Sequence, residues 1–387
     1  MAGPRKSIRS RPWCAVASVT GALASFVLAS PVRAANIFGN AGLTVVGFAV
    51  DPSVRSQAMG GASGAVFWGQ NPNYWANPAL LGFVEGIAYE DAARGTFASD
   101  SKARRLTLGY GGVGLATAGP PFSGLAQFES SLFLSVSGLG DFNVSEETQS
   151  WGMGLSVSRI LSTVAGLRGQ EPPAISRYAD VVVGYNHKTD KFSTDPSLVV
   201  HTTGEDWGVL ARGTLPMQLG SGGIPARIEA AYAYSVQNAN DASFNQSSPV
   251  NRPHRHSLAA RFALDHPASW RKRMPVWVAP GLDPLLSVGG AWDREFITAG
   301  DGPTFDDASH LGGELGFANV AFLRLGQDDN GHDWGYALAL PLGAMGGFQY
   351  SESQRRFEDD SVQKSHAWLF WVSPVEIART LRGARDH

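Results

Sequence analysis

The chain has 387 residues, of which 43% are apolar and 17% charged, with a formal net charge of −3 and a mean hydropathy of −0.09. A mean hydropathy near zero excludes a protein built from many transmembrane helices, and an all-β protein of this length folds as one unit. Residues 1–34 hold five basic and no acidic residues, so the rest carries 26 basic and 34 acidic residues, a net charge of −8. This excess of acidic residues argues against a nucleic acid as partner.

Residues 1–34 have the pattern of a cleaved secretory signal peptide. A basic start at 5–11 is followed by an apolar core at 16–28 and a small-residue cleavage context at 32–34. The apolar core is shorter than the roughly 20 residues that a membrane-spanning helix needs. The sequence's one cysteine, Cys14, lies within this segment. The exported chain is therefore predicted to contain no disulfide, zinc site or thiol chemistry.

The next stretch, residues 35–85, is rich in small residues and does not alternate. Gly60 and Gly61 let the backbone approach a wall closely, and Pro78 forces Asn77 into an extended conformation. These properties suit a compact turn inside a closed space. We interpret residues 35–85 as an N-terminal hatch, or plug, in the lumen of a β-barrel.

The order of residues in this stretch resembles the N-terminal signature of FadL-type outer-membrane proteins, closest to the PorV and PorQ branch. The first block is Ala58 to Ala62, and the second is Asn77-Pro78-Ala79. Members commonly have Phe-Trp directly before Asn-Pro-Ala, whereas here GQNPNYWA separates the two and Trp75 partly restores the pattern. The resemblance implies that the hatch and ligand path are formed by Met59, Gly60, Gly61, Phe67, Trp68, Trp75, Asn77, Pro78 and Ala79.

Residues 86–373 alternate with a period of two. In 226–236, Ile228, Tyr232 and Tyr234 fall on one side and Glu229 on the other. Together with the export signal, the lack of cysteine and aromatic residues at the ends of outward faces, this predicts an all-β fold: a closed antiparallel outer-membrane β-barrel of about 14 strands. A secreted β-sandwich is the alternative. Among the predicted strands are 103–116, 149–160, 197–203 and 206–218.

Residues 310–339 also resemble the late hairpin of the FadL-type family, through Gly312, Glu314, Arg324, Gly326 and Gly335. Alternation places Glu314 and Arg324 on the lumen side. A three-residue turn at 318–320 then sets them opposite each other, which predicts an inward ion pair with a structural or a ligand-contacting role.

The remaining inward positions are expected to be mostly Gly, Ala, Ser and Thr with few charges, which suits a hatch and an elongated apolar ligand. After the barrel, residues 374–387 form a C-terminal tail. Pro374 can begin a short helix with Val375, Ile377 and Leu381 on one face and Gly383 as its end.

Other motifs have two interpretations each. His254 and His256 could bind a metal or lie at a solvated strand start, and residues 328–333 could bind calcium or form a polar turn. Residues 270–273 could touch lipid headgroups or form a solvated loop. The glycines at 109–114 lie in a β pattern that lacks the helix of a nucleotide site, and no nucleophile elbow occurs. We therefore predict no enzyme activity, no catalytic residue, no metal and no cofactor.

The resemblance implies a barrel in the outer membrane of a Gram-negative cell that allows passive uptake of hydrophobic, fatty-acid-like molecules. The alternative that it implies is a PorV-like docking or shuttle component in protein secretion or surface attachment. The expected partners are outer-membrane lipid, a hydrophobic small molecule and, for the alternative, secreted proteins. A secreted sandwich without a channel is the third hypothesis.

Overall fold

The computed structural model describes residues 51–383, except for gaps at 96–98, 119–127, 137–139, 195–197, 221–222, 241–242, 245–247, 250, 272–281, 300–307, 330 and 358–359. The predicted signal peptide, residues 35–50 of the predicted hatch and residues 384–387 of the tail lie outside the described part of the chain.

The described chain is mostly strand. The strands are β1 (Gly86–Gly95), β2 (Ser99–Tyr110), β3 (Val113–Ala118), β4 (Phe128–Val136), β5 (Gly140–Ser156), β6 (Ala179–Thr194), β7 (Leu198–Leu219), β8 (Ile224–Val236), β9 (Ser243–Phe244), β10 (Ser248–Pro249), β11 (Asn251–Leu264), β12 (Leu286–Ala299), β13 (Ala308–Phe317), β14 (Ala321–Asp328), β15 (Gly331–Pro341), β16 (Gly346–Phe357) and β17 (Val362–Val372). The helices are α3 (Val54–Ala58), α4 (Val157–Leu167), α5 (Ala268–Arg271) and α6 (Pro374–Gly383), with 3₁₀ turns η1 (Pro78–Phe83), η2 (Ala174–Arg177) and η4 (Gly343–Met345).

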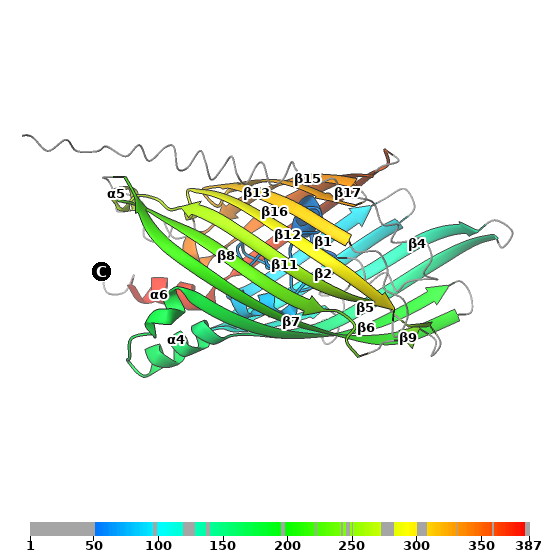
Figure 1. Cartoon of the computed structure of the whole chain (residues 1–387), viewed down its shortest axis with the longest axis horizontal. Helices are drawn as coiled ribbons and strands as arrows, with labels where there is room; N and C mark the ends of the chain where they lie inside the picture. The colour runs from blue at the N-terminus through cyan, green and yellow to red at the C-terminus, as the bar shows by residue number, and fades with distance from the viewer. Residues whose placement is uncertain are drawn as a thin grey trace, which may run out of the picture.

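The main sheet closes on itself. Its 15 strands pair antiparallel, and β1 pairs with both β2 and the last strand β17. Strands β3 and β4 occupy successive parts of one position between β2 and β5, so the wall is a closed barrel of 14 strands. The predicted fold class is confirmed, and Figure 1 shows the tilted strands of the wall. A closed barrel leaves no unpaired sheet edge.

Strand β8 shows how the wall divides its side chains between two faces. Ile228 and Tyr232 are 38% and 46% exposed on the outside, whereas Glu229, Ala231 and Ala233 are buried. The outside of the wall thus carries an apolar band. This band includes Leu108, Leu115, Trp151, Met153, Val181, Val183, Trp207, Leu258, Leu315, Leu325, Trp334, Leu338, Trp368 and Phe370, all exposed.

The sequence predicted too many breaks in one region and too few in another. Predicted strands 197–203 and 206–218 are the single strand β7, because the polar run at 204–206 continues the alternation, with Asp206 buried in the lumen. Predicted strand 103–116 is two strands, because the chain reverses at Gly111 and Gly112, whose φ angles are 61° and 92°. These two errors cancel in the strand count.

The predicted strand 149–160 is wrong beyond Ser156, where α4 begins. The Ser156 side chain accepts the backbone N–H of Arg159 at 3.3 Å, which caps the helix. Asp180 of β6 accepts the Ser156 hydroxyl at 2.6 Å and the Ser158 N–H at 2.9 Å. The first turn of α4 is therefore tied to the wall.

Helix α6 lies at the same end of the barrel as α4 (Figure 1). It begins at Pro374, and Ser373 alone separates it from the end of β17. Among the described residues, no helix combines the length and the apolar content needed to cross a bilayer.

Candidate functional site

The candidate site is the contact between residues 51–85, called the leading segment from here on, and the inner face of the wall. In Figure 1, α3 lies among the wall strands. Of the predicted path residues, Met59, Trp75, Asn77 and Ala79 are at most 1% exposed. Phe67, Trp68 and Pro78 are also buried. The leading segment thus lies inside the barrel.

Local sequence explains the two turns of this segment. Gly60 and Gly61, with φ of 65° and 84°, end α3 in the left-handed region that glycine favours. Asn77 is extended before Pro78, at φ −152° and ψ 109°, as a residue preceding proline must be. Its side-chain oxygen accepts the N–H of Ala79 at 3.0 Å and so caps η1.

A row of glycines crosses five neighbouring strands on the inner face of the wall. In the strand register each member lies directly opposite the next; the glycine row is Gly109 (β2), Gly114 (β3), Gly154 (β5), Gly184 (β6) and Gly208 (β7). A Cβ at Gly184 would stand 2.2 Å from the Pro78 carbonyl carbon, and one at Gly208 only 1.9 Å from Asn77 Oδ1. The glycine row is therefore the groove in which Asn77 and η1 lie.

The opposite wall makes a second close contact with the leading segment. A Cβ at Gly312 would lie 2.5 Å from the Met59 carbonyl oxygen, and one at Gly326 would lie 2.0 Å from the Gly60 nitrogen. His310 also places Nδ1 at 2.8 Å from the Gly60 carbonyl oxygen. The backbone of residues 59–60 therefore rests directly on β13 and β14.

The β13–β14 hairpin sets up the charged part of the site. Ala318 and Asn319 turn the chain with φ of 49° and 55°, and this register puts Glu314 opposite Arg324. The Arg324 Nε donates to Glu314 Oε2 at 2.7 Å, with both side chains 2% exposed. The structure thus places this pair in the lumen.

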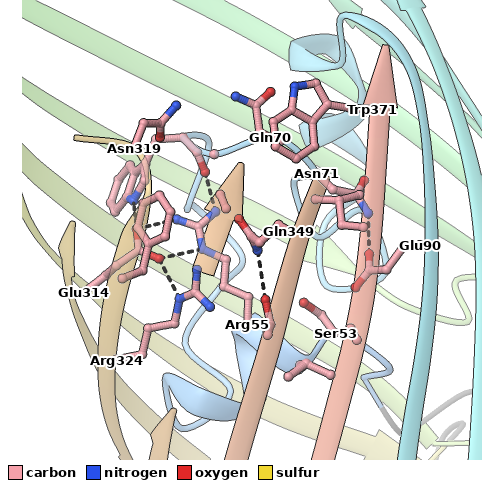
Figure 2. Close-up of a pocket in the computed structure, with 18 of the residues that line it drawn as sticks. Ser53, Arg55, Gln70, Asn71, Glu90, Glu314, Asn319, Arg324, Gln349 and Trp371 are labelled. Atoms are coloured by element: carbon pink, nitrogen blue, oxygen red, sulfur yellow. Dashed lines mark hydrogen bonds and ion pairs between the residues drawn. The ribbon is translucent and has the colours of Figure 1, made fainter. Parts of the chain in front are cut away.

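The leading segment shares this carboxylate. Arg55 donates to Glu314 through Nη2 at 2.8 Å and through Nε at 3.0 Å, and Trp68 donates its indole N–H at 2.9 Å (Figure 2). Glu314 is therefore the common acceptor of two guanidinium groups and one indole. Sequence reasoning missed Arg55, because no local pattern links residues 259 positions apart.

A second carboxylate holds the leading segment through its backbone. Asp293 is fully buried, and its Oδ2 accepts the N–H groups of Ser63 and Gly64, both at 3.0 Å. An acceptor for two N–H groups of this segment fixes the position of residues 63–64 relative to β12.

We predict that Asp293→Ala frees this part of the leading segment, because two buried N–H groups lose their acceptor at a cost of about 1–3 kcal/mol each. Hydrogen exchange measured by mass spectrometry should then become faster for the peptide containing Ser63 and Gly64. The half-exposed Asp91 pairs with Arg104 at 3.6 Å, so Asp91→Ala serves as the control and should leave that exchange unchanged. Equal protection in both variants would contradict the role given to Asp293.

The lumen is more charged than the sequence predicted. The expectation of few inward charges is wrong, because ionisable residues occupy inward positions in many strands, where they pair with one another or meet the leading segment. The buried ones include Glu90, Arg105, Asp180, Lys188, Asp190, Asp206, Glu229, Asp293, Glu295, Glu314, Arg324 and Asp333. Of these residues, alternation had placed Glu229, Glu314 and Arg324 on the inward side.

Aromatic side chains of the leading segment meet several of these cations. The Lys188 ammonium lies 4.5 Å from the ring centre of Trp75 and 2.8 Å from Asp206, and both charged side chains are fully buried. The Arg105 guanidinium lies 5.7 Å from the ring centre of Tyr74. Such contacts between a cation and a ring are attractive, and more so without water.

An apolar seam runs between the leading segment and strands β6 to β8. It is a cluster in which Phe67, Leu80 and Phe83 of the leading segment join Val182 and Leu210 of the wall. Phe67 and Phe83 also contact each other, with ring centres 5.6 Å apart. The contact between the leading segment and this part of the wall is therefore apolar, unlike the charged contact at Glu314.

A small cavity remains beside the charged cluster. Its volume is about 40 Å³, and Arg55, Trp68, Glu314, Arg324 and Gln349 are among its lining residues (Figure 2). A space of this volume has room for only a few water molecules and is far too small for an acyl chain. A larger solute at this position requires movement of the leading segment.

The histidines considered as metal ligands lie on the outer side of β11. His254 and His256 each have Nδ1 within hydrogen-bonding distance of a tyrosine hydroxyl, Tyr234 at 2.9 Å and Tyr232 at 2.8 Å. Within the described residues, no group of three or more His, Cys, Asp or Glu is arranged to hold a metal ion.

The fold and the site define a closed antiparallel β-barrel with its own leading segment in the lumen. No family model and no curated protein matches the chain. Solved structures that it resembles include the Ralstonia pickettii toluene transporter TbuX, with 12% identity over 83% of this chain and 98% of that one at a TM-score of 0.37. The CymD monoaromatic hydrocarbon channel is 11% identical, with 86% of this chain and 99% of that chain covered and a TM-score of 0.40. A Pseudomonas aeruginosa FadL homologue is 7% identical, with 82% of this chain and 96% of that chain covered and a TM-score of 0.35. Similarity this distant assigns neither a family nor an activity to the chain.

Proposed function

We propose that this chain is a FadL-type barrel of the Gram-negative outer membrane, exported with a cleaved signal peptide, and that a hydrophobic small molecule crosses it passively. The observation that carries the proposal is the apolar band on a closed wall. The large apolar side chains on the outside of the strands can contact the hydrocarbon of a bilayer. The charged side chains lie on the inside, as in the polar lumen of an outer-membrane barrel.

In this proposal the leading segment is the hatch. It fills the lumen between the glycine row and the β13–β14 hairpin, so a solute passes only when part of the segment moves. The apolar seam at Phe67 and Phe83 gives the solute a surface to follow. The pair of Glu314 with Arg324 stays within the wall when Arg55 leaves, so movement does not leave the buried carboxylate without a partner.

Uptake in a Gram-negative host that lacks its own long-chain uptake barrel tests this function. Expression of the chain should increase uptake of a labelled long-chain fatty acid, while uptake of a labelled sugar stays at the level of the empty vector. Fractionation and heat-modifiable gel mobility establish that the barrel has reached the outer membrane. Correct assembly with no gain in fatty-acid uptake would contradict the proposed transport.

The secretion role remains a prediction from the resemblance to PorV and PorQ proteins. Deletion of the gene in its own organism would test it through the amount of protein anchored at the cell surface. Loss of surface protein with unchanged uptake of hydrophobic solutes would favour that role over transport.

A further inference from the structure

Helix α4 exposes its apolar side and turns its polar side toward the protein. Val157, Leu161, Val164 and Leu167 are exposed, at 48%, 45%, 38% and 81%. Their spacing places them on one side of the helix. In a water-soluble protein such an apolar face packs against the core, so its exposure calls for another contact.

The polar side of α4 faces the protein instead. Ser158 is buried, and its N–H bonds Asp180. Ser162 lies within 3.1 Å of the Ser176 hydroxyl in η2, and Thr163 donates to the Gly111 carbonyl at 3.4 Å. These bonds fix the orientation of the helix, so the apolar side cannot turn inward without breaking them.

The exposed face of α4 continues the apolar band. Val157 follows the outward residues Trp151 and Met153 of β5, while Val181 and Val183 of the adjoining strand β6 are 48% and 45% exposed. The outward positions at the end of β5, including Leu155, and the first residue of α4 are all apolar. The apolar band of the wall therefore extends onto α4.

Basic residues mark the far end of this surface. Arg168 directly follows α4, and Arg177 ends η2; both are exposed, as is Ile175 of η2. An apolar helix face with arginines at its border matches the boundary between acyl chains and lipid phosphates.

We propose that α4 and η2 form an interfacial element that lies in the membrane surface at the end of the barrel where α6 lies, with its apolar face among the lipid acyl chains. The occupant of this face is lipid, because the face continues the apolar band and ends at two exposed arginines, which suit lipid phosphates. The inference rests on the proposed outer-membrane location and adds a second, non-spanning contact to it.

Site-specific fluorescence tests this contact in the full chain with Cys14→Ser. Single cysteines at Leu161, at Val164, at Glu171 in the exposed loop after α4, and at Leu258 in the middle of β11 are labelled with an environment-sensitive dye. Each protein is reconstituted in phosphatidylcholine–phosphatidylglycerol vesicles that carry bromine either near the headgroup or deep in the acyl chain. Labels at Leu161 and Val164 should be quenched by shallow bromine at least about twice as strongly as the label at Glu171.

The one label on the wall and the two labels on the helix separate the possible failures. Deep bromine should quench the label at Leu258; no quenching there would refute the membrane location itself. Quenching at Leu258 with none at Leu161 and Val164 would overturn the interfacial role of α4 alone. In that case, accessibility to iodide would show a face in water, and protection from iodide a protein contact or a second copy; either result rejects lipid as the occupant.

Discussion

Replacing Gly184 by Val should prevent the leading segment from docking and destabilise the barrel by about 3 kcal/mol, near the upper end for an overpacked site. The added Cβ would meet the backbone of Pro78 and Ala79 at 2.2–2.3 Å, and backbone atoms cannot move aside as a side chain can. Chemical denaturation in detergent measures the stability. Cleavage within residues 51–85 by an added protease reports whether the segment is still docked.

Gly213→Val is the matched control, because Gly213 lies in the neighbouring strand β7 and its nearest atom to an added Cβ is 3.9 Å away. Valine is favoured in strands, so a loss at Gly184 and not at Gly213 comes from the contact with the leading segment. Equal stability and equal protease resistance in the two variants would show that the glycine row does not hold this segment.

Glu314→Gln should have the second large effect. Glu314 is the one carboxylate bound by both Arg55 and Arg324, and removing a charge from a buried pair costs about 3–5 kcal/mol. The variant is expected to unfold at lower denaturant concentration and to become sensitive to trypsin after Arg55, which the wild type protects.

The predicted order of stability among three variants, together with one control, makes this prediction specific. Arg55→Gln and Arg324→Gln each leave Glu314 with one guanidinium partner, so each should cost less than Glu314→Gln. Glu85→Gln removes a carboxylate that is 70% exposed and pairs with Arg159, and it should leave stability unchanged. A Glu314→Gln barrel as stable as wild type would mean that this cluster does not anchor the leading segment.

The choice of a closed barrel over a β-sandwich needed the export signal, the lack of cysteine and the outward aromatic residues as well as the alternation. Alternation by itself gave the face of Ile228, Tyr232 and Glu229, because a period of two fixes which side chains share a face. It also gave the register of Glu314 and Arg324 once the turn at 318–320 was assumed. Such features depend on neighbours in sequence or in one hairpin.

The features that the sequence did not reveal depend on distant contacts. The five members of the glycine row are scattered from residue 109 to 208, and only the register shows that they line up against Asn77 and η1. Few inward charges were expected, whereas the structure buries many, with partners that lie on other strands or in the leading segment. Helix α4 was missed because its first apolar residue, Val157, continues the alternation of β5.

Planar-bilayer conductance tests most directly whether the leading segment closes the barrel. The purified full chain should insert without forming a steady open pore, whereas the chain lacking residues 51–83, folded by the criterion of heat-modifiable mobility, should show stable open channels. Two results would contradict closure of the lumen by the leading segment. One is a full chain that conducts as well as the shortened chain, and the other is a correctly folded shortened chain that never conducts.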